Sequence, residues 1–377
     1  MDTTFRGSET GTLGVEWELQ LVDVESRELC NDAAAVLDAL PPPPAGTPPT
    51  VKHELMQHTV EIVSGVCRSV AEVKADLAGT VAMVREVVES RGLTLACAGS
   101  HPISDWRTAT IAPGERYAEL LERCQWPVRR IQTFGVHVHV GVGTGDLAVA
   151  VVNGLTAYIP HVLALTASSP YWSGEDTGLA SSRAIVFGVL PTAGLPMPVA
   201  DWAGFERYVN AMERAGTISD IKDVWWDIRP QPALGTVENR VSDGIPTLRE
   251  VGMVAALTQC LVDEMTERAA AGDPPERPAP WVVRENKWRA GRYGLDTDVL
   301  VDDEGATRPL REDLTRLVER LTPRAGRLGC AEDLATVTDV LLHGASYQRQ
   351  RAVVEKGGGL EDVVDLLTGE MRRDQIA

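Results

Sequence analysis

Carboxylates recur at alternating positions inside apolar segments that have the composition of β-strands. The clearest segment, residues 14–21, reads Gly-Val-Glu-Trp-Glu-Leu-Gln-Leu and carries Glu16 and Glu18 two positions apart. Side chains at positions i and i+2 of a strand point to the same face of a sheet, so these two carboxylates share a face. Acidic residues are depleted in strands and are costly to bury without a partner. The pattern therefore indicates a bound cation, and oxygen-rich clusters of this kind suit Mg²⁺ or Mn²⁺.

Two further apolar segments carry carboxylates in the same way. Glu54 and Glu61 bracket the segment Glu-Leu-Met-Gln-His-Thr-Val-Glu. Near residue 240, the segment Thr-Val-Glu-Asn-Arg-Val places Glu238 and Arg240 on one strand face. The recurrence makes a shared cation site a better explanation than three unrelated exposed strands.

Two histidines alternate with apolar residues in another segment, residues 134–142, which reads Phe-Gly-Val-His-Val-His-Val-Gly-Val. Strict alternation puts His137 and His139 on one face of a strand. Neutral imidazole binds Mn²⁺ or Zn²⁺ well and Mg²⁺ occasionally. The alternatives are two histidines packed on a polar sheet face, or the metal site of an amidohydrolase-type hydrolase. The hydrolase would need further ligands at later strand ends, and only His161 and His343 follow, neither in a strand-like setting.

Three arginines lie near polar strand faces, at positions 183, 229 and 240. Any one of them could form a surface salt bridge, but arginine also binds carboxylate or phosphate in a bidentate manner. Together they indicate an anionic substrate.

Two other segments are less specific. The pair Trp225-Trp226 is typical of a core. The segment 285–294, which includes Asn286 and Arg292, mixes amide, cationic and aromatic groups as nucleotide contacts do, although a solvated helix start has the same composition.

Composition excludes several classes of protein. The net charge of −18 argues against a general nucleic-acid binder, which needs clustered Lys and Arg. We find no run of about 18 apolar residues, so no membrane span is expected. The N-terminus lacks the apolar core of a signal peptide, which favours the cytoplasm. The six cysteines form no Cys-x-x-Cys pair and are expected to be small buried hydrophobic residues.

The order of expected elements predicts an α+β fold with a mainly antiparallel sheet, because strands and helices mix without a regular β-α-β alternation. Two Pro-rich stretches, 41–49 and 274–280, are expected to be loops. The strand candidates are 13–23, 51–64, 93–98, 134–142, 183–189 and 224–229, and the helix candidates are 70–91, 148–166, 247–271, 311–321, 331–343 and 360–373. We expect one domain over residues 1–377, with a helical C-terminal segment from about 305 to 377.

Four of these motifs, at residues 14–18, 134–141, 236–243 and 285–294, together resemble bacterial glutamate–cysteine ligase type 2, also called YbdK-like carboxylate–amine ligases. The resemblance runs from about residue 11 to 296. It implies a glutamine-synthetase-like catalytic fold, in which an antiparallel sheet forms a funnel that ATP enters at one end and the amino acid at the other.

The implied reaction joins an amino-acid carboxylate, expected to be the γ-carboxylate of glutamate, to cysteine or another amine. An acyl phosphate is the intermediate, and ADP and phosphate are released. No protein nucleophile is needed, because positioning and charge neutralisation drive phosphoryl transfer. The implied partners are small-molecule amino acid and amine substrates, without nucleic acid or membrane. A homodimer is a guess from the frequency of dimers among soluble enzymes.

The resemblance also implies roles for individual residues. The implied ligands of Mg²⁺ or Mn²⁺ are Glu16, Glu18, Glu54, Glu61, His137 and Glu238. The implied catalytic residues are Arg240, Glu238 and Arg229. The implied ATP contacts are Glu18, Arg240, Asn286 and Arg292, and the implied substrate contacts are His139, Arg183, Arg229 and Trp226.

Overall fold

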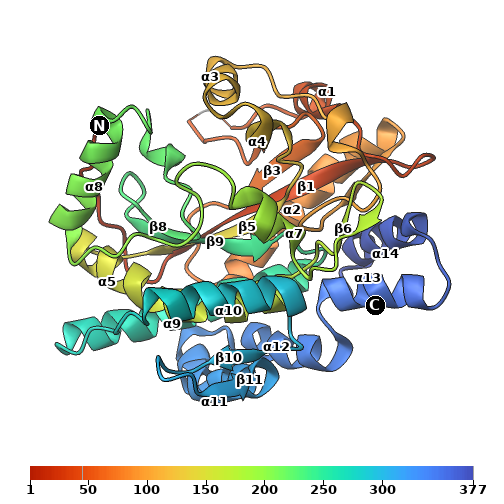
Figure 1. Cartoon of the computed structure of the whole chain (residues 1–377). Coiled ribbons are helices and arrows are strands. Elements are labelled where there is room, and N and C mark those ends of the chain that lie inside the picture. The colour runs from red at the N-terminus through yellow and green to blue at the C-terminus, as the bar shows by residue number, and fades with distance from the viewer. Residues whose placement is uncertain (45, 377) are drawn as a thin grey trace.

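A seven-stranded antiparallel sheet forms the centre of the computed structural model, which describes residues 1–44 and 46–376 (Figure 1). The strand order is β2-β3-β1-β5-β9-β8, with β4 also paired to β1. The bounds are β1 Leu13–Asp23, β2 Val51–His53, β3 Thr59–Val63, β4 Leu93–Ala96, β5 Gly135–Gly141, β8 Ile228–Gln231 and β9 Thr236–Asp243. Every pair in this sheet is antiparallel, as the sequence predicts.

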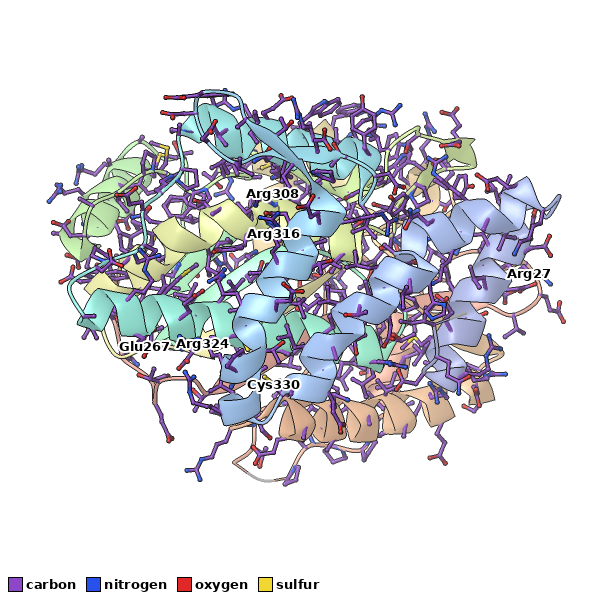
Figure 2. The ribbon with its side chains drawn as sticks, turned by 90° about the horizontal axis from the view of Figure 1, so that it is seen from below. Arg27, Glu267, Arg308, Arg316, Arg324 and Cys330 are labelled. Atoms are coloured by element: carbon purple, nitrogen blue, oxygen red, sulfur yellow. The ribbon has the colours of Figure 1, made fainter. Side chains whose placement is uncertain are left out.

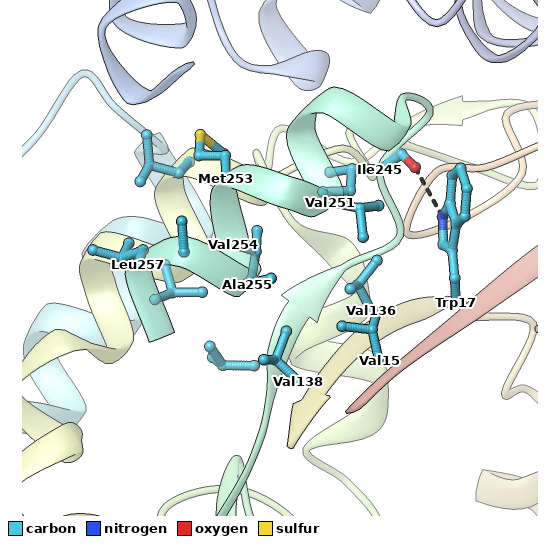
Figure 3. Packing of buried hydrophobic residues seen from close by; sticks show 14 of the residues in the cluster. Val15, Trp17, Val136, Val138, Ile245, Val251, Met253, Val254, Ala255 and Leu257 are labelled. Atoms are coloured by element: carbon cyan, nitrogen blue, oxygen red, sulfur yellow. Dashed lines mark hydrogen bonds between the residues drawn. The ribbon is translucent and has the colours of Figure 1, made fainter. Parts of the chain in front are cut away.

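The apolar face of the sheet packs against a layer of helices. Val15 of β1 and Val138 of β5 alternate with the polar residues of their strands and meet the long helix α9 (Leu248–Ala270) (Figure 3). Trp17 lies beside them, and its indole Nε1 donates a hydrogen bond to the Ile245 carbonyl at 3.1 Å (Figure 3). Burial of this face leaves the opposite, polar face for chemistry.

Three further helices complete the apolar layer: α2 (Val70–Ser90), α5 (Gly145–Leu155) and α6 (Ile159–Thr166). Helix α2 begins where the Ser69 side chain accepts a hydrogen bond from the Glu72 backbone N–H, and it buries one apolar stripe at helical spacing. The stretch 145–166 is long and apolar enough to cross a membrane, contrary to our reading of the sequence. Because 72% of its most apolar window is buried inside the protein, it has the character of a core helix.

An outer layer of helices covers the first. Helix α10 (Pro280–Tyr293) lies on α6, whereas α11 (Leu310–Leu328) and α12 (Ala331–His343) lie on α9. Arg324 of α11 forms an ion pair with Glu267 of α9 at 2.6 Å (Figure 2). A small hairpin, β10 (Asp298–Leu300) and β11 (Thr307–Pro309), precedes α11, and α13 (Ser346–Glu355) and α14 (Leu360–Arg373) end the chain near β4.

The polar face of the sheet is covered by shorter elements. They are α3 (Glu115–Cys124), α4 (Trp126–Arg129) and α7 (Ser182–Phe187) (Figure 1). Helix α1 (Ala33–Ala39) instead packs against β2 and α2 in the apolar core, and α8 (Trp202–Arg214) packs on α5. The face therefore lies between the sheet and a cover made from several distant parts of the chain.

Some expected elements differ in the structure. Of residues 183–189, expected as a strand, 183–187 belong to helix α7, because Ser181 caps a helix by accepting a hydrogen bond from the Ala184 N–H. A short apolar run cannot be assigned to strand or helix by periodicity alone. The expected strand 51–64 is a hairpin of β2 and β3, and the strand expected at 224–229 begins only at Ile228.

The Pro-rich stretches match their prediction as loops, except that Pro280 already begins α10 and Ala45 lies outside the described residues. Helices α1, α3, α4, α8 and α10 and the β10–β11 hairpin were not among the expected elements, whereas α13 lies in the C-terminal segment expected to be helical.

Candidate functional site

Strand register brings the alternating carboxylates of β1 into contact with their neighbours. Glu18 of β1 lies opposite Glu61 of β3, and Glu16 lies opposite His137 of β5. Residues paired across an antiparallel sheet have Cβ atoms about 5 Å apart on the same face. The three strands thus place four polar side chains side by side on the face opposite the core.

The same row continues across β5, β9 and β8. His139 lies opposite Glu238, and Glu238 lies opposite Arg229. A register shift between β5 and β9 sets Arg240 and its neighbour opposite the single residue His137. The Arg240 Nη1 atom is 3.4 Å from His137 Nδ1, so this irregularity aims the guanidinium into the row.

Two groups in this row have the donor atoms of a metal site. In the group that we call cluster A, one ligand atom each from Glu16, His139 and Glu238 lie within 4.8 Å of one another. In cluster B, carboxylate oxygens of Glu18, Glu54 and Glu61 meet the same limit. Oxygen donors with at most one imidazole suit Mg²⁺ or Mn²⁺.

Cluster A is rich in compensating charge. The Glu238 carboxylate accepts hydrogen bonds from Arg229 Nε at 2.7 Å and from Arg240 Nη1. Burial opposes ionisation of Glu238, but the two guanidinium groups outweigh it and hold its pKa well below the usual range. Burial also disfavours a charged His139, yet Glu238 and Glu16 together raise the pKa of this imidazole.

Cluster B has weaker compensation, since Arg183 and Arg240 attract Glu18 without outweighing its burial and the charge of Glu54. Burial and the charge of Glu54 raise the pKa of Glu18 to about 8, although the Gly135 N–H donates a hydrogen bond to Glu18 Oε2. Burial and the charges of Glu16 and Glu54 raise the pKa of Glu61 well above its usual range. One surface lysine, Lys52, lies 3.5 Å from Glu61. A divalent cation would relieve this repulsion.

His137 lies between the two clusters. Its Nδ1 is 3.0 Å from Glu16 Oε2, whereas its Nε2 is buried, has no hydrogen-bond partner among the described residues and lies 3.9 Å from Glu18 Oε1. Burial and Arg240 lower its pKa to about 4, which keeps the imidazole neutral near pH 7. A neutral imidazole with a free buried nitrogen fits a metal ligand or a contact to substrate.

A narrow cavity of about 120 Å³ opens beside cluster B. From the sheet side it is lined by Glu18, His137 and Arg240, and from α7 by Arg183. The Arg183 guanidinium donates to the carbonyls of Val241 and Arg240 at 3.5 and 3.3 Å. The covering segments add residues that the sequence analysis did not select, namely Arg116, Tyr117, Leu120, Thr133, Phe187, Leu190 and Trp225.

Three residues expected at the site lie elsewhere. Trp226 packs against Phe205 and Tyr208 in a small apolar cluster, while its neighbour Trp225 lines the cavity. The Asn286 amide exchanges two hydrogen bonds with the backbone of Leu300.

Arg292 donates to the Gly178 carbonyl and stacks near Tyr293. In the structure as described, no contact joins Trp226, Asn286 or Arg292 to cluster A or cluster B. A role for Asn286 or Arg292 at ATP would thus need the nucleotide to extend away from the clusters.

The hydrolase alternative finds no support in this arrangement. Within residues 1–44 and 46–376, the groups able to hold a metal are cluster A and cluster B, and each is dominated by glutamate. The next histidine along the chain, His161, lies on helix α6 in the layer on the apolar side of the sheet. Its Nε2 is hydrogen-bonded to Asp313 Oδ2 at 2.8 Å.

Comparison with known proteins gives one consistent result. The family model described as glutamate-cysteine ligase family 2 matches residues 12–366. A protein of Thermobifida fusca, provisionally named glutamate–cysteine ligase 2, is 56% identical over 373 residues, which cover 99% of this chain and 94% of that protein.

Solved structures share the fold at low identity. A glutamate–cysteine ligase of Francisella tularensis in complex with AMP has a TM-score of 0.68 at 11% identity, covering 98% of this chain and 90% of that one. A bifunctional glutathione synthetase of Pasteurella multocida has a TM-score of 0.64 at 14% identity. The match covers 96% of this chain and 52% of that one. The fold class expected from the sequence is confirmed.

Proposed function

From the premise that the chain belongs to glutamate–cysteine ligase family 2, whose members are ATP-dependent carboxylate–amine ligases, we propose that clusters A and B form its catalytic centre. The observation that carries the proposal is the meeting of five glutamates, two histidines and three arginines beside one sheet face, with Glu54 supplied by the β2–β3 connection and Arg183 by α7. The carboxylate to be activated is the γ-carboxylate of glutamate, and the acceptor is cysteine or another small amine.

The chemistry needs a phosphorylated carboxylate. Joining a carboxylate to an amine is uphill in water, so the carboxylate oxygen first attacks the γ-phosphorus of ATP and ADP departs. The amine then attacks the acyl phosphate carbon, a C–N bond forms, and phosphate leaves with the C–O bond electrons. The protein has to hold the reactants in line and neutralise developing negative charge.

The proposed roles follow the charges of the residues. Arg240, beside His137 and at the cavity wall, is suited to stabilise the transferring phosphoryl group. Arg229 and Glu238 form a buried ion pair. Glu238 also pairs with Arg240, so it fixes the position of that guanidinium group. Arg183 is suited to bind an anionic part of the substrate.

The donor sets of the two clusters fit Mg²⁺ or Mn²⁺. Glu16, His139 and Glu238 would hold one ion, and Glu18, Glu54 and Glu61 another, with His137 and its free Nε2 between them. When bound, such ions would offset the negative charge of the phosphate groups. The orphaned His137 nitrogen and the mutual repulsion within cluster B are the local observations that favour this assignment.

The remaining expectations are part of the same proposal. We propose that the chain acts as one catalytic domain, since residues of α11, α12 and α14 pack into the same apolar core as the sheet. A cytoplasmic location, a homodimer and the absence of nucleic-acid or membrane partners are further expectations from the sequence.

A two-substrate assay tests the function. Purified protein with ATP, Mg²⁺, glutamate and a panel of amines should release ADP only when donor and acceptor are both present. Glu16→Gln should abolish this release while the protein stays folded, and Glu86→Gln, an exposed carboxylate on α2, should not change it. Amide hydrolysis without ADP release, or full activity of Glu16→Gln, would contradict the proposal.

A further inference from the structure

Helix α3 forms the wall of the cavity that faces the polar side of the sheet. Arg116 and Tyr117 lie in its first turn, Leu120 lies about one turn further on, and all three line the cavity. Leu120 belongs to a small apolar cluster with Leu190 and Trp225, which anchors α3 over the carboxylates. A charged side chain on this helix is therefore held at the cavity rather than on a free surface.

The other three arginines of the proposed centre, Arg183, Arg229 and Arg240, already have partners. Arg229 and Arg240 both bond Glu238, whose carboxylate they share. Arg183 donates to two backbone carbonyls, and its Nη1 lies 4.0 Å from Asp243. Arg183 and Arg229 are buried, the Arg240 side chain is 13% exposed, and all three guanidinium groups are held by these contacts before any substrate arrives.

Arg116 differs from them in both respects. It is exposed at the mouth of the cavity, and across the described residues it has no hydrogen bond or ion pair. Arg116 is thus a cation directed at the cavity with its five N–H donors free.

An amino-acid substrate brings a carboxylate that does not react. Near two glutamate clusters such a group is repelled unless a cation meets it, and arginine binds carboxylate through two parallel hydrogen bonds. We propose that Arg116 receives the non-reacting carboxylate of an amino-acid substrate at the cavity mouth and so selects amino acids over simple amines or acids. This inference rests on the proposed ligase function and adds a specificity residue to it.

The test compares Arg116→Gln and Arg116→Lys with Arg129→Gln. Arg129 is an exposed arginine of the neighbouring helix α4 that, among residues 1–44 and 46–376, bonds Gln125 and does not line the cavity. Steady-state ADP release is measured with glutamate as donor and with either cysteine or cysteamine, which lacks the carboxylate, as acceptor. Loss of a hydrogen-bonded charge pair should raise KM for the recognised substrate about 10- to 100-fold in Arg116→Gln, which corresponds to about 1.4–2.7 kcal/mol.

The two acceptors identify which carboxylate is bound. If Arg116 holds the acceptor, KM rises for cysteine but not for cysteamine. If it holds the donor, KM for glutamate rises with both acceptors. In either case KM for ATP and kcat should change less than about threefold, since uniform binding is lost rather than transition-state binding. Arg116→Lys should recover part of the loss, and Arg129→Gln should behave as the wild type.

Two different negative results distinguish failure of the Arg116 inference from failure of the proposed ligase function. Unchanged KM for glutamate and cysteine in Arg116→Gln, or a rise confined to ATP, would overturn the role of Arg116 while leaving the ligase intact. A wild-type protein that neither releases ADP with glutamate nor binds glutamate in calorimetry with Mg²⁺ and an ATP analogue would defeat the proposed function itself.

Discussion

Neutralising Glu18 should make the metal-free protein more stable, although the residue belongs to the proposed catalytic centre. Burial and the neighbouring Glu54 raise its folded-state pKa from the ordinary 4.5 to about 8. Between these two values the folded protein holds a proton that the unfolded chain has released, so folding stability falls as pH rises through this window. Glu18→Gln removes that ionisation and keeps an oxygen that can accept the Gly135 N–H.

The magnitude follows from the pKa difference. Each pH unit within the window costs about 1.4 kcal/mol, so the wild type has lost about 3 kcal/mol by pH 7 relative to a protein without this carboxylate. Water entry and relaxation of the cavity screen the charges, so the loss of folding free energy has about 3 kcal/mol as its upper limit. Glu18→Gln should match the wild type near pH 4.5 and exceed its free energy of unfolding by about 1–3 kcal/mol at pH 7.

Urea denaturation in EDTA at several pH values measures this difference, with Glu86→Gln as the surface control. Adding Mg²⁺ at about 100 times its dissociation constant should stabilise the wild type by about 2.7 kcal/mol, and Glu18→Gln by less, because the variant has lost a ligand. A variant that is equally or less stable than the wild type at pH 8 in EDTA would refute the electrostatic reasoning. It would mean that Glu18 is already compensated in the protein without metal.

Two further substitutions test other charges. Glu238→Ala leaves Arg229 and Arg240 buried without their shared carboxylate, so urea denaturation should show a loss of about 3–5 kcal/mol; a loss under about 1 kcal/mol would contradict the buried pair. The hydrogen bond from His161 lowers the pKa of Asp313 to about 2, so this carboxylate stabilises the fold above pH 3.8 and the stabilisation disappears as pH falls toward 2. Asp313→Asn should therefore lose about 1–2 kcal/mol at pH 6, and a gap from the wild type that does not shrink on acidification would contradict this linkage.

The central strands were predictable because their evidence is local. Strand β1 matches its expected bounds of 13–23, and β5 lies within the expected 134–142, since both alternate strictly and each is long enough for periodicity to be unambiguous. Helix α7 was missed because a short apolar run after Ser181 fits strand and helix equally well.

The cavity wall was beyond the sequence for a different reason. Arg116 lies about 100 residues from Glu18 along the chain and on a helix whose polar composition resembles any solvated surface. The choice between Trp225 and Trp226 also depends on packing, because adjacent residues point to different sides and only Phe205 and Tyr208 show which side is the core. Such contacts join distant segments and leave no periodic trace.

By itself the sequence determined which side chains share a face. A strand repeats every two residues, so Glu16 with Glu18, and Glu238 with Arg240, were fixed as pairs by spacing alone. The tertiary structure decided which pairs meet. Register between strands sets Glu18 against Glu61, and this long-range pairing divides the carboxylates into one cluster balanced by arginines and one that repels itself.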